Sequence, residues 1–280
     1  MPEIKDIRNA WKTKFLPAKF TEDERASMFA SVREEYLSQS HDPETITHIW
    51  EQLWAIWNRG ILRMKTITPC SKTAMEISAL EYKGRMLIYV PPRVSTGKDF
   101  VALAKLFPDQ NFFWFMRSDR HHMLQNINQS GWIDTEAALE TPNLLSDQLT
   151  PYRRSLIDVL DTLTFSKGRS GLTVNSYAIA SEFAKVIYGR YLDQETMSYL
   201  PGSYHPDFLV LGVSKPNGTV DYEFFHQYTY YWARKFPRNM GIRTSSIADI
   251  KGRKEPDSLD DLGFNRLFGL PPEIDSEVKQ

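Results

Sequence analysis

The stretch Phe208–Tyr228, FLVLGVSKPNGTVDYEFFHQY, decides the fold class of this chain. Two runs rich in β-branched and aromatic residues, 208–214 and 219–228, flank the turn sequence Lys215-Pro-Asn-Gly218. Such runs separated by a short Pro-Asn-Gly segment are typical of an antiparallel β-hairpin. The sequence therefore predicts paired strands in this part of the chain.

The length of the turn sets the register of the hairpin. A three-residue loop places Pro216 at a turn position that suits its fixed φ and Gly218 at a left-handed position. Asp207 then lies opposite Gln227, and its side chain points to the other face from His226. A two-residue loop would instead bring Asp207 and His226 to one face, but it would place Pro216 in the hydrogen-bonded ladder. We expect the three-residue loop.

Helices are expected at the N-terminal end, because residues 1–59 contain no glycine. Thr21 followed by Glu24 is a capping-box pattern, and Asp42-Pro43 combines a capping side chain with proline in the first helical position. Apolar residues then recur every three or four positions at Ile46, Ile49, Trp50, Leu53, Trp54 and Trp57. This period predicts an amphipathic helix whose indoles fill a core, with a partner-docking face as the alternative.

The middle of the chain alternates short apolar runs with turn residues. Residues 74–82 and 85–90 flank Lys83-Gly84 and are interpreted as a second hairpin. Asp99 and Thr150-Pro151 are predicted to begin helices, the first extending through Phe107. Residues 166–171 are interpreted as a loop. For residues 111–132 and 174–192, helix and strand both fit the pattern.

Helices at one end followed by hairpins predict an α+β fold, with an N-terminal helical subdomain packed on a core of antiparallel hairpins and further helices. We place the helical subdomain at residues 1–66 and the α+β core at residues 67–250. Residues 251–280 are interpreted as an acidic, loosely ordered C-terminal tail.

The composition is that of an ordinary soluble globular protein. Of 280 residues, 41% are hydrophobic and 25% are charged, with 34 Lys and Arg against 35 Asp and Glu. These values argue against a disordered chain, a collagen-like repeat or a disulfide-stapled scaffold. Cys70 is the single cysteine, which favours a reducing, cytoplasmic compartment. No signal peptide, membrane span, cofactor site or metal site is expected from the sequence.

Four titratable residues around the first hairpin are candidates for catalysis: His205, Asp207, Glu223 and His226. Acid and imidazole groups in one pocket could serve a hydrolase, or a nuclease that uses a metal ion. A proline and an aspartate before a strand, with acids in the next strand, fit the nuclease pattern. The lysine expected two positions after Glu223 is missing, so that pattern is incomplete.

A basic, aromatic segment between Tyr230 and Lys254 is a candidate for nucleic-acid binding. Positive charges among aromatic rings suit a phosphate backbone with stackable bases. The candidate residues are Tyr230, Trp232, Arg234, Lys235, Arg238 and Arg243. The alternative is a solvated surface whose charge is neutralised by the acidic residues of 255–280.

The sequence as a whole contains no complete catalytic motif. We therefore expect a cytoplasmic binding or interaction protein without catalytic turnover. Its partner, a protein or an anionic molecule, is expected at residues 204–245. The alternatives are the hydrolase or metal-dependent nuclease and the nucleic-acid-binding protein described above.

Overall fold

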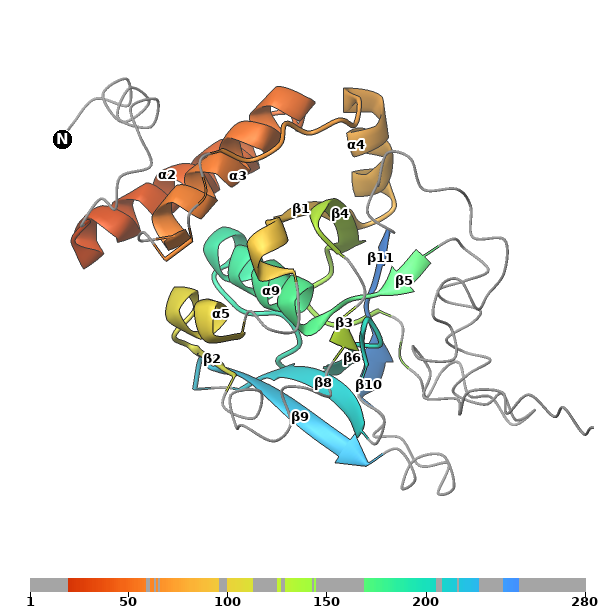
Figure 1. Ribbon diagram of the computed structural model, residues 1–280. Coiled ribbons are helices and arrows are strands. Elements are labelled where there is room, and N and C mark those ends of the chain that lie inside the picture. The colour runs from red at the N-terminus through yellow and green to blue at the C-terminus, as the bar shows by residue number, and fades with distance from the viewer. Residues whose placement is uncertain are drawn as a thin grey trace, which may run out of the picture.

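A computed structural model gives the arrangement of the chain (Figure 1). It describes residues 20–58, 61–62, 64, 66–95, 100–112, 125–126, 129–142, 144, 169–204, 208–215, 217–226 and 239–246. The helices are α2 (Glu22–Ser38), α3 (Pro43–Asn58), α4 (Ala74–Tyr82), the short 3-10 helix η1 (Pro92–Val94), α5 (Phe100–Leu106) and α9 (Val174–Tyr188).

The strands of the described residues form two sheets and one separate pair. They are β1 (Arg85–Val90), β2 (Gln110–Asn111), β3 (Gln125–Asn126), β4 (Gly131–Glu136), β5 (Arg169–Gly171), β6 (Met197–Tyr199), β7 (Ser203–Tyr204), β8 (Phe208–Ser214), β9 (Val220–His226), β10 (Met240–Ile242) and β11 (Thr244–Ser246). One sheet has the order β1-β4-β11-β5, the other has the order β10-β6-β8-β9-β2, and β3 pairs with β7. The first sheet is antiparallel and the second is mixed. The fold is α+β, as predicted.

The two N-terminal helices begin at the predicted caps. Thr21 and Glu24 form both hydrogen bonds of a capping box at the start of α2. The Asp42 side chain accepts a hydrogen bond from the backbone N–H of Thr45 at 2.7 Å, at the start of α3. These caps satisfy N–H groups that have no partner within the helix.

Residues 74–82 form helix α4, so their interpretation as a strand was wrong. Thr73 and Glu76 make a capping box at its start, and Gly84 adopts a positive φ of 68° where the chain leaves the helix. The run of apolar residues fits helix and strand equally, and the local cap decides between them. Residues 85–90 form strand β1 as expected, paired with β4 rather than with residues 74–82.

The hairpin of β8 and β9 has the register that the three-residue loop predicts. Phe208 lies opposite His226 and Ser214 lies opposite Val220. Gly218 adopts a φ of 81° in the turn, a left-handed conformation that glycine tolerates best. The prediction from turn chemistry is therefore confirmed for the paired residues.

Helix and strand both fitted the sequence of residues 174–192, and the structure has helix α9 there. Thr173 caps α9 by accepting a hydrogen bond from the N–H of Ser176, and Gly189 ends it in the left-handed conformation. Residues 169–171, predicted as loop, instead form β5. The described parts of 111–132 contain short strand segments. Helix α5 follows the predicted Asp99 cap, while Asp99, Thr150-Pro151 and the acidic tail lie outside the described residues.

Helix α9 is the centre of the molecule. It lies between the α2–α3 pair and the β8–β9 hairpin (Figure 1), and it contacts α2, β1 and β8. On the α3 side, Trp50 stacks on Phe183 with ring centroids 5.0 Å apart. Trp50 and Trp54 are 0% exposed and Trp57 is 3% exposed. The prediction that these indoles fill a core is confirmed.

A buried ionic network joins the strands of the β1-β4-β11-β5 sheet. Arg85 of β1 pairs with Asp134 and, at 3.0 Å, with Glu136, both on β4. Arg169 of β5 reaches Asp134 at 2.6 Å, and Thr244 of β11 donates to Glu136 at 2.5 Å. Burial alone would raise the pKa of Asp134, but Arg85, Ser246 and Arg169 lower it to about 2. The network is balanced in charge and holds the sheet together.

Candidate functional site

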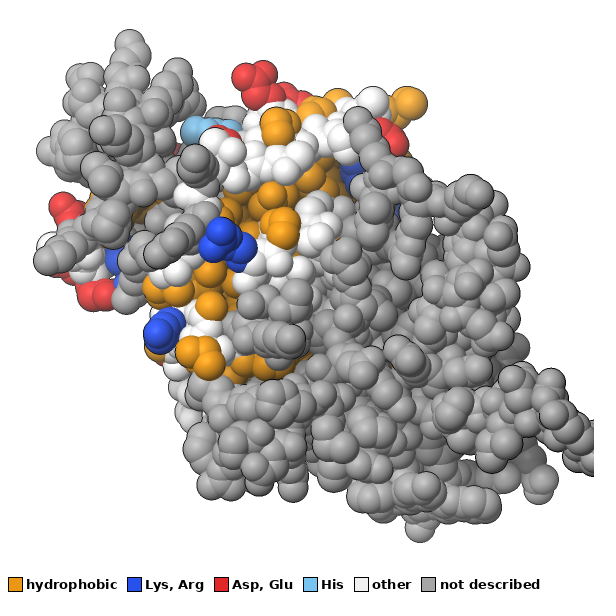
Figure 2. Space-filling view, in the orientation of Figure 1, with side chains coloured by type: hydrophobic (Ala, Val, Ile, Leu, Met, Phe, Trp, Pro, Cys, Tyr) orange, Lys and Arg blue, Asp and Glu red, His pale blue; other side chains and the backbone are white. Residues whose placement is uncertain are grey.

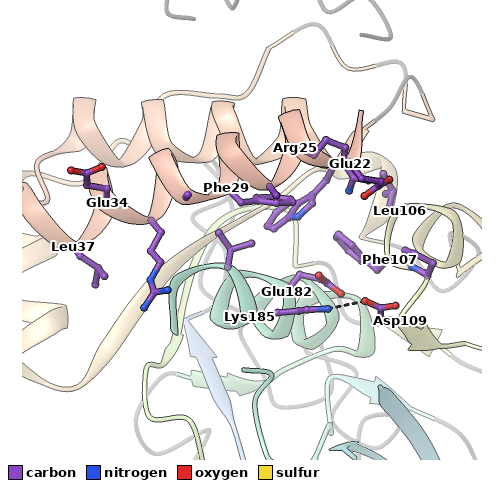
Figure 3. A pocket seen from close by; sticks show the side chains of 16 residues that line it. Glu22, Arg25, Phe29, Glu34, Leu37, Leu106, Phe107, Asp109, Glu182 and Lys185 are labelled. Carbon is purple, nitrogen blue, oxygen red and sulfur yellow. Dashed lines mark hydrogen bonds and ion pairs between the residues drawn. The ribbon is translucent and has the colours of Figure 1, made fainter. Parts of the chain in front are cut away.

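A groove of about 790 Å³ lies between α2, the end of α5 and α9 (Figure 3). Its apolar walls include Phe29 and Leu37 of α2, Trp57 of α3, and Leu106 and Phe107 at the end of α5. The residues that line it are Glu22, Arg25, Ala26, Phe29, Ala30, Arg33, Glu34, Leu37, Trp57, Leu106, Phe107, Pro108, Asp109, Glu182, Lys185 and Val186.

Helical periodicity places these side chains in the groove. On α2, Arg25, Phe29, Arg33 and Leu37 follow one another at intervals of four residues, so they form one stripe along the helix. On α9, the lining residues 182, 185 and 186 have the spacing of adjacent helical turns. The groove is therefore the seam between two packed helices, closed at one end by α5.

Glu182 is the buried carboxyl group of this site, with only 8% of the residue exposed. Its Oε1 atom accepts a hydrogen bond from the side-chain amide of Gln110 at 3.0 Å. Gln110 also donates to the carbonyl of Ala178 at 2.9 Å and accepts from the hydroxyl of Tyr222 at 2.5 Å. Burial raises the pKa of Glu182 from 4.5 to about 7, against the opposing effects of Gln110 and Lys185. The group therefore changes its charge near neutral pH.

A second polar cluster stands beside Glu182. The Nζ atom of Lys185 lies 2.7 Å from the carboxylate of Asp109 and 2.7 Å from the hydroxyl of Tyr191. The hydrogen bond from Lys185 lowers the pKa of Asp109, and burial raises that of Tyr191. Figure 3 shows Glu182, Lys185 and Asp109 together on the side of the groove opposite α2. Lys185 and Asp109 neutralise each other.

On the α2 wall, Arg25 forms an ion pair with Glu22 at 2.8 Å. Its guanidinium group lies 6.0 Å from the centre of the Phe29 ring. The Nε atom of Arg25 is buried and has no hydrogen-bond partner among the described residues. This wall thus combines a neutral ion pair with aromatic surface.

Of the four predicted catalytic residues, the structure describes Glu223 and the strand position of His226. His205 and Asp207 lie outside the described residues. Glu223 lies opposite Leu211 and His226 lies opposite Phe208 on the same strand pair. In the described residues no group of three or more His, Cys, Asp or Glu side chains could hold a metal ion.

Of the predicted nucleic-acid-binding residues, Arg243 is the one that the structure describes. Tyr230, Trp232, Arg234, Lys235 and Arg238 lie outside the described residues. Arg243 is 0% exposed, and its Nη2 atom lies 2.7 Å from the carboxylate of Asp193. It also donates to the backbone carbonyls of Glu136, Ala138 and Leu139. Its charge is therefore used inside the fold and is not available to a nucleic acid.

Sequence reasoning missed the groove and Glu182. One signal was present: in the 15 residues of α9, VNSYAIASEFAKVIY, Glu182 and Lys185 are the only charged side chains. A carboxyl group in an otherwise apolar helix is rarely left buried without a role or a partner. The groove itself joins segments more than 150 residues apart, which no local pattern reveals.

A second surface feature lies outside the groove. On the face shown in Figure 2, hydrophobic side chains gather over the described residues from α4 towards α5. Met75 and Tyr82 of α4 are 79% and 93% exposed, and Val101 of α5 is 52% exposed. This surface offers no convergent polar groups that would identify a ligand, in contrast to the groove.

Within the described residues, no helix is both long enough and apolar enough to span a lipid bilayer. Comparisons with protein-family models, with curated proteins and with solved structures found no match to this chain.

Proposed function

We propose that this chain is a binding protein that acts without catalytic turnover, and that a small ligand occupies the groove between α2, α5 and α9. The observation that supports this most directly is the groove itself. Its volume of about 790 Å³ falls within the range of small-molecule sites, which are mostly apolar with a few oriented polar groups. Phe29, Trp57 and Phe107 supply the apolar surface, and Glu182 supplies a buried polar group.

The ion pairs of the groove favour binding over catalysis. General acid–base catalysis needs titratable groups that face the reacting atoms. Lys185 and Asp109 are joined at 2.7 Å, and Arg25 and Glu22 at 2.8 Å.

The sequence predicts a partner site at residues 204–245. From this region, Tyr222 donates a hydrogen bond to Gln110 and orients it. Cys70 is the single cysteine of the sequence and has no partner for an intramolecular disulfide, which favours a cytoplasmic location.

The test is to fill the groove. Ala30 lines it and is exposed on α2, so Ala30→Trp should occupy the site without disturbing the core. Isothermal titration calorimetry with naphthylethanol, a neutral aromatic probe, should show binding to the unmodified chain and at least tenfold weaker binding to Ala30→Trp.

Ser27→Trp is the matched control, because Ser27 is exposed on the same helix and does not line the groove. It should bind the probe like the unmodified chain. Equal binding to Ala30→Trp and Ser27→Trp, or no binding by the unmodified chain up to the solubility limit, would overturn the proposal.

A further inference from the structure

We propose that the ligand of the groove carries a primary or secondary ammonium group, which pairs with the carboxylate of Glu182 while the apolar body of the ligand lies against Phe29, Trp57 and Phe107. This inference rests on the proposed function and specifies the chemistry of its ligand.

The position of Glu182 supports this assignment. The residue lines the groove from α9, opposite the α2 wall (Figure 3). Its Oε1 atom is fixed by Gln110, which is itself held by Ala178 and Tyr222. A carboxylate oriented by a supported neighbour is prepared to receive a hydrogen-bond donor without reorganisation.

The charges around the groove support a cationic ligand. The groups facing Glu182 are Lys185 of the same helix, Asp109 and Gln110 after α5, Tyr191 after α9 and Tyr222 of β9. Lys185 is held by Asp109 and Tyr191, and on α2 Arg25 is held by Glu22. Arg33 and Glu34 of α2 also line the groove, as exposed side chains of opposite charge.

Lys185 lies on the same helix and favours the charged form of Glu182, but its Nζ atom is held by Asp109 and Tyr191. Burial therefore still outweighs the charge compensation that the carboxylate of Glu182 receives. A buried carboxylate is stabilised when an oppositely charged group approaches it. An ammonium group would supply that charge, whereas a carboxylate on the ligand would be repelled.

Proton release accompanies binding in this scheme. The pKa of Glu182 is about 7, so the carboxylate that attracts the ammonium group is present above that pH and is lost below it. The apparent affinity for an amine should therefore fall about tenfold between pH 8 and pH 6, because binding must then remove the proton. A neutral ligand of the same shape should show no such dependence.

Three probes with one aromatic body test the inference: naphthylethylamine, naphthylethanol and naphthylacetate. By calorimetry at pH 8, the amine should bind at least tenfold more tightly than the alcohol, and the acetate should bind most weakly. At pH 6 the amine should lose about tenfold in affinity while the alcohol is unchanged. The amine stays protonated at both pH values, so the change reports the protein.

Glu182→Gln keeps the shape of the side chain and removes its charge. It should bind the alcohol normally, lose the preference for the amine and lose the pH dependence. Glu44→Gln is the control, since Glu44 is an exposed acid on α3 that does not line the groove, and it should behave like the unmodified chain. If Glu182→Gln fails to fold, the change in amine affinity of the unmodified chain between pH 8 and pH 6 still tests the inference.

The outcomes separate the two proposals. Equal binding of amine and alcohol at pH 8, or a preference abolished equally by Glu44→Gln, would overturn the ammonium inference and leave the groove as a binding site. Failure of the unmodified chain to bind naphthylethanol, the neutral probe, would overturn the proposed function itself.

Discussion

Folding and proton binding are linked at Glu182. Its pKa is raised from 4.5 to about 7 by burial, so between these values the native state holds a proton that the unfolded state releases. The stability that Glu182 contributes should therefore be greatest below about pH 4.5 and should fall as the pH rises to 7. The contribution of this residue is roughly 3 kcal/mol between pH 4 and pH 8.

Urea unfolding of Glu182→Gln at pH 5 and pH 8 checks that linkage. The variant should lose most of the pH dependence and should be more stable than the unmodified chain at pH 8, by about 1–3 kcal/mol. Glu44→Gln should keep the original pH dependence. An identical fall in stability with pH in Glu182→Gln would show that other groups are responsible.

Arg243 and Asp193 form an ion pair in which both side chains are 0% exposed. Arg243→Met would leave the carboxylate of Asp193 buried without its cation, which should cost about 3–5 kcal/mol. Adding Asp193→Asn removes the second charge and should recover part of that loss, because asparagine tolerates the positive φ of 57° at this position.

Chemical denaturation followed by circular dichroism measures these losses in stability. The control is Arg93→Met, since Arg93 is exposed on η1, and its effect should stay within about 0.5 kcal/mol. A similar small effect for Arg243→Met would mean that the buried pair contributes little.

At the level of single residues, sequence reasoning succeeds where the role is local and fails where it depends on distant partners. The Trp50, Trp54 and Trp57 side chains share one helical stripe, so their burial could be predicted. Arg243 looked like part of a basic surface because its neighbours in sequence are basic. Its partner Asp193 is 50 residues away, and only the folded chain brings them together.

At the level of elements, the contact between β8 and α9 depends on a glycine. A Cβ atom at Gly212 would lie 2.5 Å from the ring of Tyr177, which is 0% exposed and cannot move aside. Gly212→Ala should therefore push the strand from the helix and cost about 1–3 kcal/mol.

Gly218→Ala distinguishes this steric effect from backbone strain. A Cβ atom at Gly218 meets nothing within 4 Å, but the φ of 81° is unfavourable for alanine. It should cost about 1 kcal/mol and should leave the packing around Tyr177 unchanged in amide and aromatic NMR spectra. Gly212→Ala should shift the Tyr177 signals, and an unshifted spectrum would contradict the steric account.

Helix caps and turn sequences predicted the helices and the hairpin correctly, whereas short apolar runs did not distinguish helix from strand. The caps at Thr21 and Asp42 and the turn at Lys215–Gly218 are specified within a few residues, so helix starts and hairpin register followed from the sequence. Residues 74–82 were misinterpreted because the capping box of Thr73 and Glu76 was overlooked. The length and apolar content of that run suit either structure.

For the molecule as a whole, one hydrophobic core runs from Val32 of α2 to Tyr222 of β9. We expect the described part of the chain to unfold in a single transition, although the sequence suggested a division near residue 66. Hydrogen exchange at increasing urea should give the amides of α3 and of the β8–β9 hairpin the same free energy of global opening. Earlier opening of α2 and α3 as a unit would show that the helical part is an independent domain.

The fold class was predictable from the whole sequence, but the arrangement of the sheets was not. Helical and strand signals in separate parts of the chain were enough for an α+β prediction. The pairing of β11 with both β4 and β5 joins residues far apart in sequence, and each of these strands is too short to carry a pattern. The groove arises from the same long-range packing and could not have been derived locally.

The ionic network around Arg85 also limits how this sequence can diverge. Apolar core residues can be exchanged for others of similar size at little cost. Single changes of Arg85, Asp134 or Glu136 are costly, because each replacement upsets the balance of buried charge in the network. Homologous sequences should therefore keep these residues, or replace them together, while their aliphatic core residues vary. An arginine at the start of one strand with an Asp-x-Glu in its neighbour is then a durable mark of common ancestry.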